Sequence, residues 1–182
     1  MYAEAMSPGS PRWMQGSKQR IERVSEIEIL ESLGDHLRET IEEDSELLVI
    51  WGSGGTLRTL GESIGFTITV LGIDVTLGNE NIGTDLDENQ LIEVINNHKS
   101  QFGENAKILT LLSPMGGQGF LIGRGNLQLS PTVIRLIGID NILAIVTPAK
   151  LATLNTLRID TSDMDLDRQF QEKKYMKALQ GY

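Results

Sequence analysis

Short apolar runs alternate with amphipathic stretches from residue 46 onward. Continuous apolar runs such as 47–51 are typical of parallel strands that are buried on both faces. A hairpin is expected around Asn79-Glu80-Asn81, where 75–77 would pair with 82–84. The alternation predicts the α/β class, with a doubly wound, mainly parallel sheet and helices on both faces, in three layers. The other expected elements are strands at 67–73, 107–112, 141–146 and 157–159, and helices at 56–64, 87–97, 131–137, 148–154 and 163–179.

Residues 18–43 predict an amphipathic helix that precedes the sheet. Apolar residues recur there at three- and four-residue steps and form one stripe, namely Ile21, Val24, Ile27, Leu30, Leu33, Leu37 and Ile41. Residues 1–17 contain Ser7-Pro8-Gly9-Ser10-Pro11 and are expected to form a disordered tail. The predicted organisation is therefore a tail (1–17), a helical segment (18–43) and one α/β domain of nucleotide-binding type (44–182).

Charge and composition narrow the classes of partner. The net charge is −9 and no basic cluster is present, which argues against a nucleic-acid binder. No apolar run approaches the roughly 20 residues of a membrane span, and there is no cysteine. The N-terminus shows no apolar signal-peptide core, so we expect a cytoplasmic protein. The two histidines, His36 and His98, are expected to be exposed on helices, and no metal site is predicted.

A glycine loop follows the first predicted strand and consists of Gly52, Ser53, Gly54, Gly55 and Thr56. Glycines let a ligand approach the backbone closely, and the following helix presents its positive end. The spacing differs from a Walker A loop, because no lysine follows the last glycine. We expect these residues to bind phosphate, and the alternative is a tight strand-to-helix turn that binds nothing.

A second glycine-rich segment, residues 116–126, follows the strand predicted at 107–112 and holds five glycines. Arg124 lies between two glycines, so its guanidinium is expected to clamp a phosphate unless it forms a salt bridge to a nearby acid. Asn126 is expected to orient a base or ribose, and Lys150 is a further candidate cation. The candidate ligand-binding residues of this part are Gly116, Gly117, Gln118, Gly119, Arg124, Gly125, Asn126 and Lys150.

Acidic residues follow two of the predicted strands. Asp74 is the candidate catalytic residue, since it could bind ribose hydroxyls, hold a metal ion or act as a base; the alternative is that it caps a turn. Asp160, with Thr161, is expected to cap the turn into the last helix, whereas Asp85 and Asp87 are expected to be turn and cap residues. No Ser-His-Asp arrangement is apparent, so any chemistry is expected to be phosphoryl transfer. A Mg²⁺ ion would arrive with the nucleotide, and no tightly bound cofactor is predicted.

Together these motifs resemble a known family. Pro114-Met115-Gly116-Gly117-Gln118-Gly119-Phe120 and Gly123-Arg124-Gly125-Asn126 are similar to the C-terminal region of archaeal-type ATP-NAD kinase-like proteins, including relatives found in acetoin catabolism operons. The likeness extends to Thr147-Pro148-Ala149-Lys150-Leu151 and Arg158-Ile159-Asp160-Thr161 and covers residues 46–168. It implies that the complete protein phosphorylates NAD to NADP, with ATP and NAD as substrates.

The chain departs from the family pattern in ways that limit this inference. Family members carry an upstream α/β domain with a Gly-Gly-Asp-Gly-Thr motif, which is absent from this sequence. Ser53 and Gly55 stand where the family has a proline and a hydroxyl residue, and Leu127 replaces a usual glutamine. The resemblance therefore implies a C-terminal ligand-binding domain that is incomplete as a kinase. Its expected protein partner is a missing catalytic domain or a second copy of the chain.

The same loops also resemble those of sugar-phosphate isomerases and deaminases of the ribose-5-phosphate isomerase type. The alternative function is therefore a module that binds a sugar phosphate or another phosphorylated metabolite without catalysis. Under either function the expected ligand is a phosphorylated small molecule, such as NAD, ATP or a sugar phosphate.

Overall fold

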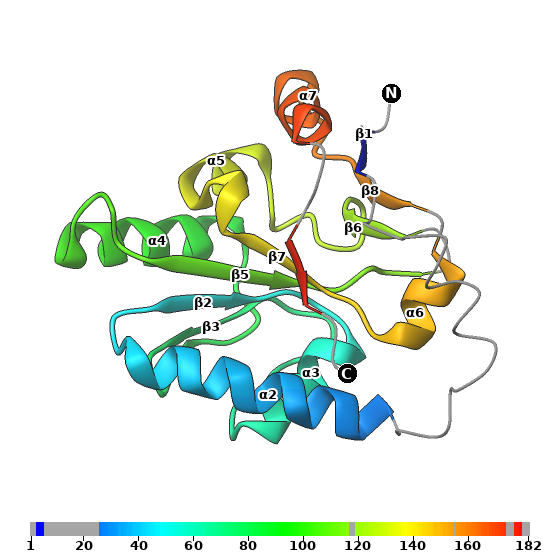
Figure 1. Cartoon of the computed structure of the whole chain (residues 1–182). Coiled ribbons are helices and arrows are strands. Elements are labelled where there is room, and N and C mark those ends of the chain that lie inside the picture. Colours follow the sequence, from blue (N-terminus) through cyan, green and yellow to red (C-terminus); the bar gives the residue numbers. More distant parts are fainter. Residues whose placement is uncertain (1–2, 6–25, 117–118, 155, 174–176, 180–182) are drawn as a thin grey trace.

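The main sheet is mixed and has six strands, in the order β4-β3-β2-β5-β7-β9. The structure, a computed structural model, describes residues 3–5, 26–116, 119–154, 156–173 and 177–179 (Figure 1). The strands β2, β5, β7 and β9 are parallel to one another, whereas β3 and β4 join by antiparallel pairing. The bounds are β2 Leu48–Trp51, β3 Asp74–Leu77, β4 Glu80–Gly83, β5 Ile108–Leu112, β7 Ile142–Ile145 and β9 Lys177–Leu179.

Helices cover both faces of this sheet, which confirms the predicted α/β class with three layers (Figure 1). The helices α2 and α3 pack on one face, and α4 and α5 pack on the other. No described helix is long and apolar enough to cross a membrane. The bounds are α2 Glu26–Glu43, α3 Gly55–Ser63, α4 Glu88–Phe102, α5 Pro131–Ile137, the 3-10 helix η1 Ile139–Asn141, α6 Pro148–Thr153 and α7 Met164–Glu172.

Alternate residues of β2 enter two different hydrophobic cores. Val49 and Trp51 pack with α2 and α3, whereas Leu48 and Ile50 pack with the residues of α4 and α5. Trp51 is fully buried, and its indole Nε1 donates a hydrogen bond to Thr76 Oγ1 at 3.1 Å. Because close-packed cores hold both sides of β2, the glycine loop that follows this strand starts from a fixed base.

A smaller three-stranded sheet, in the order β1-β8-β6, lies beside the main one (Figure 1). Strand β8 (Leu157–Ile159) was predicted, but its pairing with β1 (Ala3–Ala5) and β6 (Phe120–Ile122) was not. The strand β6 lies within the glycine-rich segment 116–126, whose high glycine content gives no recognisable strand pattern. The backbone N–H of Met115 donates to the Phe120 carbonyl at 2.8 Å and joins the small sheet to the end of β5.

The prediction of a strand at 67–73 is wrong, because this segment is a loop and β3 begins at Asp74. The backbone N–H and the hydroxyl of Thr69 both donate to the Asp74 carboxylate. The Val70 carbonyl accepts from the Gly54 N–H at 2.7 Å. These bonds use groups that a strand would need for its ladder. The predicted hairpin of β3 and β4 is confirmed, but it turns at residues 78–79 rather than 79–81, since Glu80 and Asn81 already lie in β4.

The helix predicted at 163–179 is too long. It ends at Glu172, and Lys177–Leu179 instead forms β9, which pairs with β7 at the edge of the main sheet. Pairing there satisfies backbone groups of β7 that would otherwise remain open. At the other end of the chain, the segment predicted at 18–43 is helical from Glu26, while residues 18–25 and most of the predicted tail lie outside the described residues.

The expected exposure of His98 is also wrong, since this residue is only 4% exposed. His98 follows Leu91 and Ile95 at helical spacing and therefore lies on the buried face of α4. Its Nε2 atom is 3.1 Å from the Lys107 carbonyl oxygen. His36, by contrast, is exposed as expected.

Candidate functional site

The carboxyl ends of the parallel strands β2, β5 and β7 lie along one edge of the main sheet, which we call the carboxyl edge. After β2 the chain enters α3 on one face, and after β5 it leads through β6 to α5 on the other face. Doubly wound sheets bind their ligands where neighbouring strands send their connections to opposite faces. The first glycine loop follows β2 and Ser113 follows β5, so both segments lie at this point.

Gly52 and Gly54 are needed for the geometry of the first loop. A Cβ atom on Gly52 would lie 2.7 Å from Leu112 Cδ2 and 3.0 Å from the Leu111 carbonyl oxygen. Gly54 has a φ of 126°, and it provides no side-chain cap for α3. Nothing lies within 4 Å of a Cβ placed on Gly55, the first residue of this helix. The first N–H groups of α3 are therefore available to an anion.

Lys150 joins three separate segments at the carboxyl edge. Its Nζ atom donates to Thr56 Oγ1 at 2.8 Å, to Ser113 Oγ at 3.0 Å and to the Pro114 carbonyl at 3.4 Å. The predicted phosphate-binding threonine and the predicted cation thus lie side by side. The sequence analysis gave Ser113 no role, although its position directly after the strand predicted at 107–112 was a usable signal.

The second glycine segment is described only in part, because Gly117 and Gln118 lie outside the described residues. Gly116 has a φ of 60°, and nothing lies within 4 Å of a Cβ placed on it. Gly119 has a φ of 75°, and its Cβ would lie 2.5 Å from the Thr156 carbonyl oxygen. A side chain at residue 119 would therefore push the start of β6 away from the segment that follows α6.

Asn126 points into the protein rather than toward a ligand. It is 3% exposed, its Nδ2 donates to the Leu121 carbonyl and its Oδ1 accepts from the Gly123 N–H, each at 2.9 Å. These bonds fix the turn that carries Arg124. The Arg124 side chain is exposed and forms no ion pair with any residue that the structure describes.

Met115 connects the two glycine segments. Ser53 Oγ donates to the Met115 sulfur at 3.8 Å, and a Cβ on Gly125 would lie 2.7 Å from that same sulfur. Residues of the first loop and of the second segment are therefore packed against one thioether. The structure brings together Ser53, Thr56, Lys150 and Gly125, as one site would require.

The Asp74 carboxylate is buried and holds the neighbouring loop. It accepts from the N–H and hydroxyl of Thr69, and from the Asp85 N–H at 2.8 Å. Asp85 adopts a φ of 52°, and Asp87 caps α4 in a capping box with Gln90, so both have the turn and cap roles that were predicted. Asp74 lies opposite Trp51 at the carboxyl edge, and its three bonds agree with the turn-capping alternative.

A metal site built from several protein ligands is not found among the described residues. No group of three or more His, Cys, Asp or Glu side chains is arranged there to hold a metal ion. Both carboxylate oxygens of Asp74 accept hydrogen bonds from the chain. No step through a metal ion held by these residues therefore follows from the structure.

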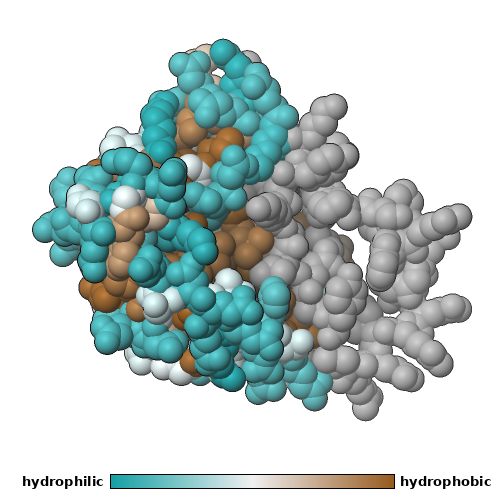
Figure 2. All heavy atoms as spheres, turned by 60° about the vertical axis from the view of Figure 1, so that its left-hand side comes forward, coloured by the Kyte–Doolittle hydropathy of each residue, from teal (hydrophilic) through white to brown (hydrophobic). Residues whose placement is uncertain are grey.

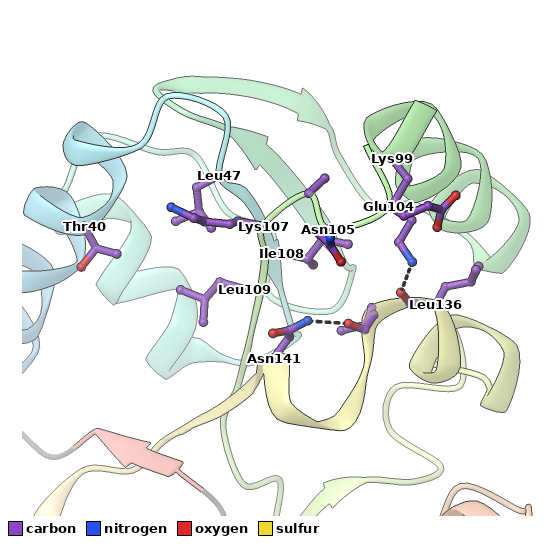
Figure 3. A pocket seen from close by; sticks show the side chains of 12 residues that line it. Thr40, Leu47, Lys99, Glu104, Asn105, Lys107, Ile108, Leu109, Leu136 and Asn141 are labelled. Carbon is purple, nitrogen blue, oxygen red and sulfur yellow. Dashed lines mark hydrogen bonds between the residues drawn. The ribbon is translucent and has the colours of Figure 1, made fainter. Parts of the chain in front are cut away.

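A cavity of about 470 Å³ lies at the opposite end of the strands, which we call the amino edge (Figure 3). Two of the polar side chains that line it, Lys99 and Asn141, have partners within the protein. Lys99 Nζ donates to the Leu136 carbonyl at 2.8 Å, and Asn141 Nδ2 donates to the Ile137 carbonyl at 2.7 Å. The face that Figure 2 shows, with the left side of Figure 1 brought forward, is covered mainly by hydrophilic side chains.

An ion pair between Lys107 and Asp44 also lies at the amino edge, with Nζ and Oδ2 2.5 Å apart. The hydrogen bond from Lys107 lowers the pKa of the Asp44 carboxyl, and the same bond raises the pKa of Lys107.

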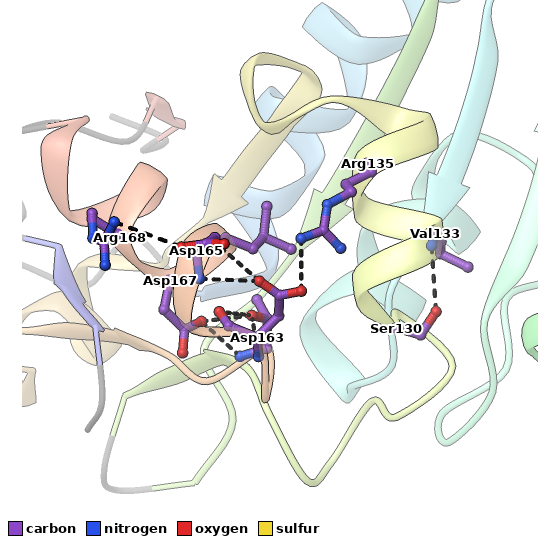
Figure 4. A network of polar contacts seen from close by, with 9 residues as sticks. Ser130, Val133, Arg135, Asp163, Asp165, Asp167 and Arg168 are labelled. Carbon is purple, nitrogen blue, oxygen red and sulfur yellow. Dashed lines mark hydrogen bonds and ion pairs between the residues drawn. The ribbon is translucent and has the colours of Figure 1, made fainter.

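An ion pair between Arg135 and Asp163 joins α5 to α7. Asp163 caps α7 and accepts from Arg135 Nη2 at 2.6 Å (Figure 4). Hydrogen bonding from the Leu166 N–H, followed by that from Arg135, lowers the pKa of the Asp163 carboxyl. Thr161, at the end of β8, donates its hydroxyl to Asp167 Oδ1 at 2.6 Å. These bonds tie the start of α7 to α5 and to the end of β8.

Comparison with known proteins agrees with this architecture. A model of the family described as ATP-NAD kinase C-terminal domain matches residues 44–180. No curated protein and no solved structure matches the chain. The match begins just before β2, so it includes both glycine segments, Lys150 and the strands β6 and β8 of the small sheet, and it reaches β9. The chain belongs to the ATP-NAD kinase C-terminal domain family.

Proposed function

We propose that this chain is the ligand-binding C-terminal domain of an ATP-NAD kinase-like enzyme, and that it binds the phosphates of NAD and ATP at the carboxyl edge. The contact of Lys150 Nζ with Thr56 Oγ1 and Ser113 Oγ carries this proposal. It places a cation and two hydroxyl groups from separate loops within hydrogen-bond distance of one another. Such a cluster, beside an uncapped helix N-terminus, suits a phosphate group.

Each group has a definite task under this proposal. Lys150 neutralises phosphate charge, Thr56 and Ser113 orient phosphate oxygens, and the N–H groups at the start of α3 complete the binding surface. Asp74 acts as a positioning residue, because it holds the loop whose Val70 carbonyl binds the Gly54 N–H. Phosphoryl transfer depends on such positioning and charge neutralisation more than on a protein nucleophile.

Catalysis would require parts that these residues do not supply. The described part of the chain has no acidic cluster for a metal ion, and the sequence has no Gly-Gly-Asp-Gly-Thr motif. We therefore propose that a further catalytic domain, which carries this motif, completes the active site. Binding of NAD or ATP by this chain alone is the part of the proposal that can be tested directly.

Isothermal titration of the full chain with NAD, NADP, ATP with Mg²⁺ and ribose 5-phosphate tests this proposal. Lys150→Met should weaken nucleotide binding by about 10- to 100-fold, or ~1.5–3 kcal/mol, because a charge-assisted hydrogen bond is lost. Lys99→Met is the matched control, since Lys99 also donates to a carbonyl but lies at the amino edge. Nucleotide affinity that is unchanged in Lys150→Met would refute the role assigned to this lysine. Binding of ribose 5-phosphate alone would favour the sugar-phosphate module.

A further inference from the structure

The cavity at the amino edge has no role in the proposed function, and the stagger of two strands leaves room for it. Strand β5 pairs with β2 from Ile108 onward, but its pairing with β7 begins only at Thr110, opposite Ile142. Residues 106–109 therefore extend beyond the start of β7, and the cavity of about 470 Å³ lies beside them (Figure 3). This volume is within the range of small-molecule sites, roughly 300–1,000 Å³.

Part of the cavity lining is apolar, and it lies where the two hydrophobic cores meet. Ile108 and Ile137 belong to the core that contains residues of α4 and α5, whereas Leu47 belongs to the core that contains residues of α2 and α3. Leu109 and Leu136 are partly buried and pack against these cores. Covering such a surface favours binding through the hydrophobic effect, so an apolar body suits the occupant.

The charged residues that line the cavity reverse the charge balance of the chain. They are Lys99, Lys107 and Glu104, in a chain with 25 acidic and 16 basic residues. Lys107 is paired with Asp44, which is not part of the lining. Lys99 pairs with no carboxylate among the residues that the structure describes. Lys99 is therefore the lining cation whose charge a ligand can neutralise.

The Lys99 side chain is half-buried and reaches from α4 to the last turn of α5 (Figure 3). An ammonium group has three donors, and the structure shows one of them in use, toward the Leu136 carbonyl at 2.8 Å. The neutral side chain of Asn141 makes the same kind of bond to the Ile137 carbonyl at 2.7 Å. Satisfying the last carbonyls of α5 therefore does not require a charge, so capping alone does not explain why a lysine stands at residue 99.

We propose that the amino-edge cavity binds an organic carboxylate with an apolar body. The carboxylate accepts a hydrogen bond from Lys99 Nζ, and the apolar body covers the leucine and isoleucine side chains of the lining. A hydrogen bond between two charged groups is shorter and stronger than one between neutral groups. This site is separate from the carboxyl edge, and the proposal does not depend on the function assigned to that edge.

NMR titration of the full chain with octanoate, octylamine and inorganic phosphate tests this proposal. Octanoate carries both the carboxylate and the apolar body, whereas octylamine has the opposite charge and phosphate has no apolar part. Octanoate should shift the amide signals of residues 106–109 and 136–141 until they saturate, and the other two compounds should not. The proposal is overturned if octanoate gives no saturating shift there, or if octylamine binds there equally well.

Substitutions at residue 99 test the role of its charge. Lys99→Met should weaken octanoate binding by about tenfold, because a charge-assisted hydrogen bond is lost. Lys99→Arg keeps the charge and should restore most of the affinity. Arg168→Met is the matched control, since it removes a cation that is paired with Asp165 on α7, and it should leave the affinity unchanged. Octanoate affinity that is equal in Lys99→Met and in the unmodified chain would refute the role of Lys99.

A variant that fills the cavity keeps the test decisive if Lys99→Met folds poorly. Ala106 lines the cavity and is half-buried, so Ala106→Leu would occupy part of the space without removing a polar group. It should weaken octanoate binding. Unchanged binding in Ala106→Leu would mean that octanoate binds elsewhere and would overturn the proposal. Because these titrations contain no nucleotide, their failure would leave the proposed function of the carboxyl edge untouched.

Discussion

The two edges of the main sheet use charge differently. At the amino edge, Lys107 pairs with Asp44, and Lys99 binds a backbone carbonyl next to the cavity. At the carboxyl edge, Lys150 contacts hydroxyl groups, and neither Arg124 nor Arg158 is paired with a described carboxylate. Under the proposed function, Lys150 at the carboxyl edge serves ligand binding, whereas the ion pair at the amino edge serves stability.

The largest difference between the two edges is expected in the free energy of unfolding when Asp74 and Asp44 are substituted. Asp74→Asn replaces a buried acceptor of three hydrogen bonds, so the amide would direct its own N–H₂ group at other donors. The free energy of unfolding should fall by ~3 kcal/mol, which is of the order expected for bonds to a buried charge. Urea denaturation measures this loss, and Asp44→Asn at the exposed pair should cause a clearly smaller one. Equal losses at the two positions would contradict the contrast between the edges.

Substitutions at the glycines of the first loop should have the second-largest effect. Gly52→Ala would bring a Cβ within 2.7 Å of Leu112 Cδ2, so it should destabilise the fold by ~1–3 kcal/mol, as overpacking does. It should also weaken nucleotide binding, because the loop that follows would shift. Gly55→Ala is the control, since its Cβ meets no atom within 4 Å and alanine favours a helix. A Gly55→Ala protein that is as unstable as Gly52→Ala would contradict the assigned geometry.

The free energy of unfolding should fall at acid pH, because the Asp163 carboxylate becomes protonated. The pKa of Asp163 is lowered in the folded state, chiefly by the Leu166 N–H and then by Arg135. A carboxyl with a lowered pKa contributes stability above its unfolded value of about 3.9. This contribution is lost as the pH falls through the folded pKa. Denaturation between about pH 3 and 6 should therefore show a declining free energy of unfolding below about pH 4. The decline should be shallower in Asp163→Asn. Identical slopes of the free energy of unfolding against pH in the two proteins would contradict the role assigned to Asp163.

The smallest effect should come from the exposed pair at the amino edge. Lys107→Met should leave nucleotide affinity unchanged, because Lys107 lies at the opposite end of the strands from Lys150. It should remove part of the acid dependence that Asp44 contributes, since the Lys107 hydrogen bond is the largest cause of the lowered pKa of Asp44. Titration calorimetry with NAD checks the first expectation. A loss of affinity would mean that the cavity, rather than the carboxyl edge, binds the ligand.

Sequence patterns correctly predict the elements that are determined by residues close together in the chain. The caps at Asp87 and Ser130 and the buried run of β5 follow from side chains close in sequence, and the structure confirms them. The segment 67–73 was mistaken for a strand because the bonds that break it come from Asp74 and from the distant Gly54. The strand β9 was mistaken for helix because only the open edge of β7 selects it.

The same division holds for the site. Glycines and cations could be found in the sequence because their residue types are distinctive. Whether a polar side chain has a partner within the protein could not be predicted from the sequence. The burial of the Arg158 Nε atom and the inward orientation of Asn126 depend on contacts between distant parts of the fold. Ser113 gains its role only when Lys150 reaches it from α6, which lies 37 positions further along the chain.

The bond from Lys150 to Thr56 spans 94 positions in the sequence. It can form only after β2, β5 and β7 have come together, and contacts over such separations are slow because loop closure must precede them. Competence to bind a ligand should therefore be the last property to return when the chain refolds from denaturant, after the helical signal has recovered. A ligand added during refolding would then report complete assembly of the sheet, and it would trap the finished fold rather than accelerate its formation.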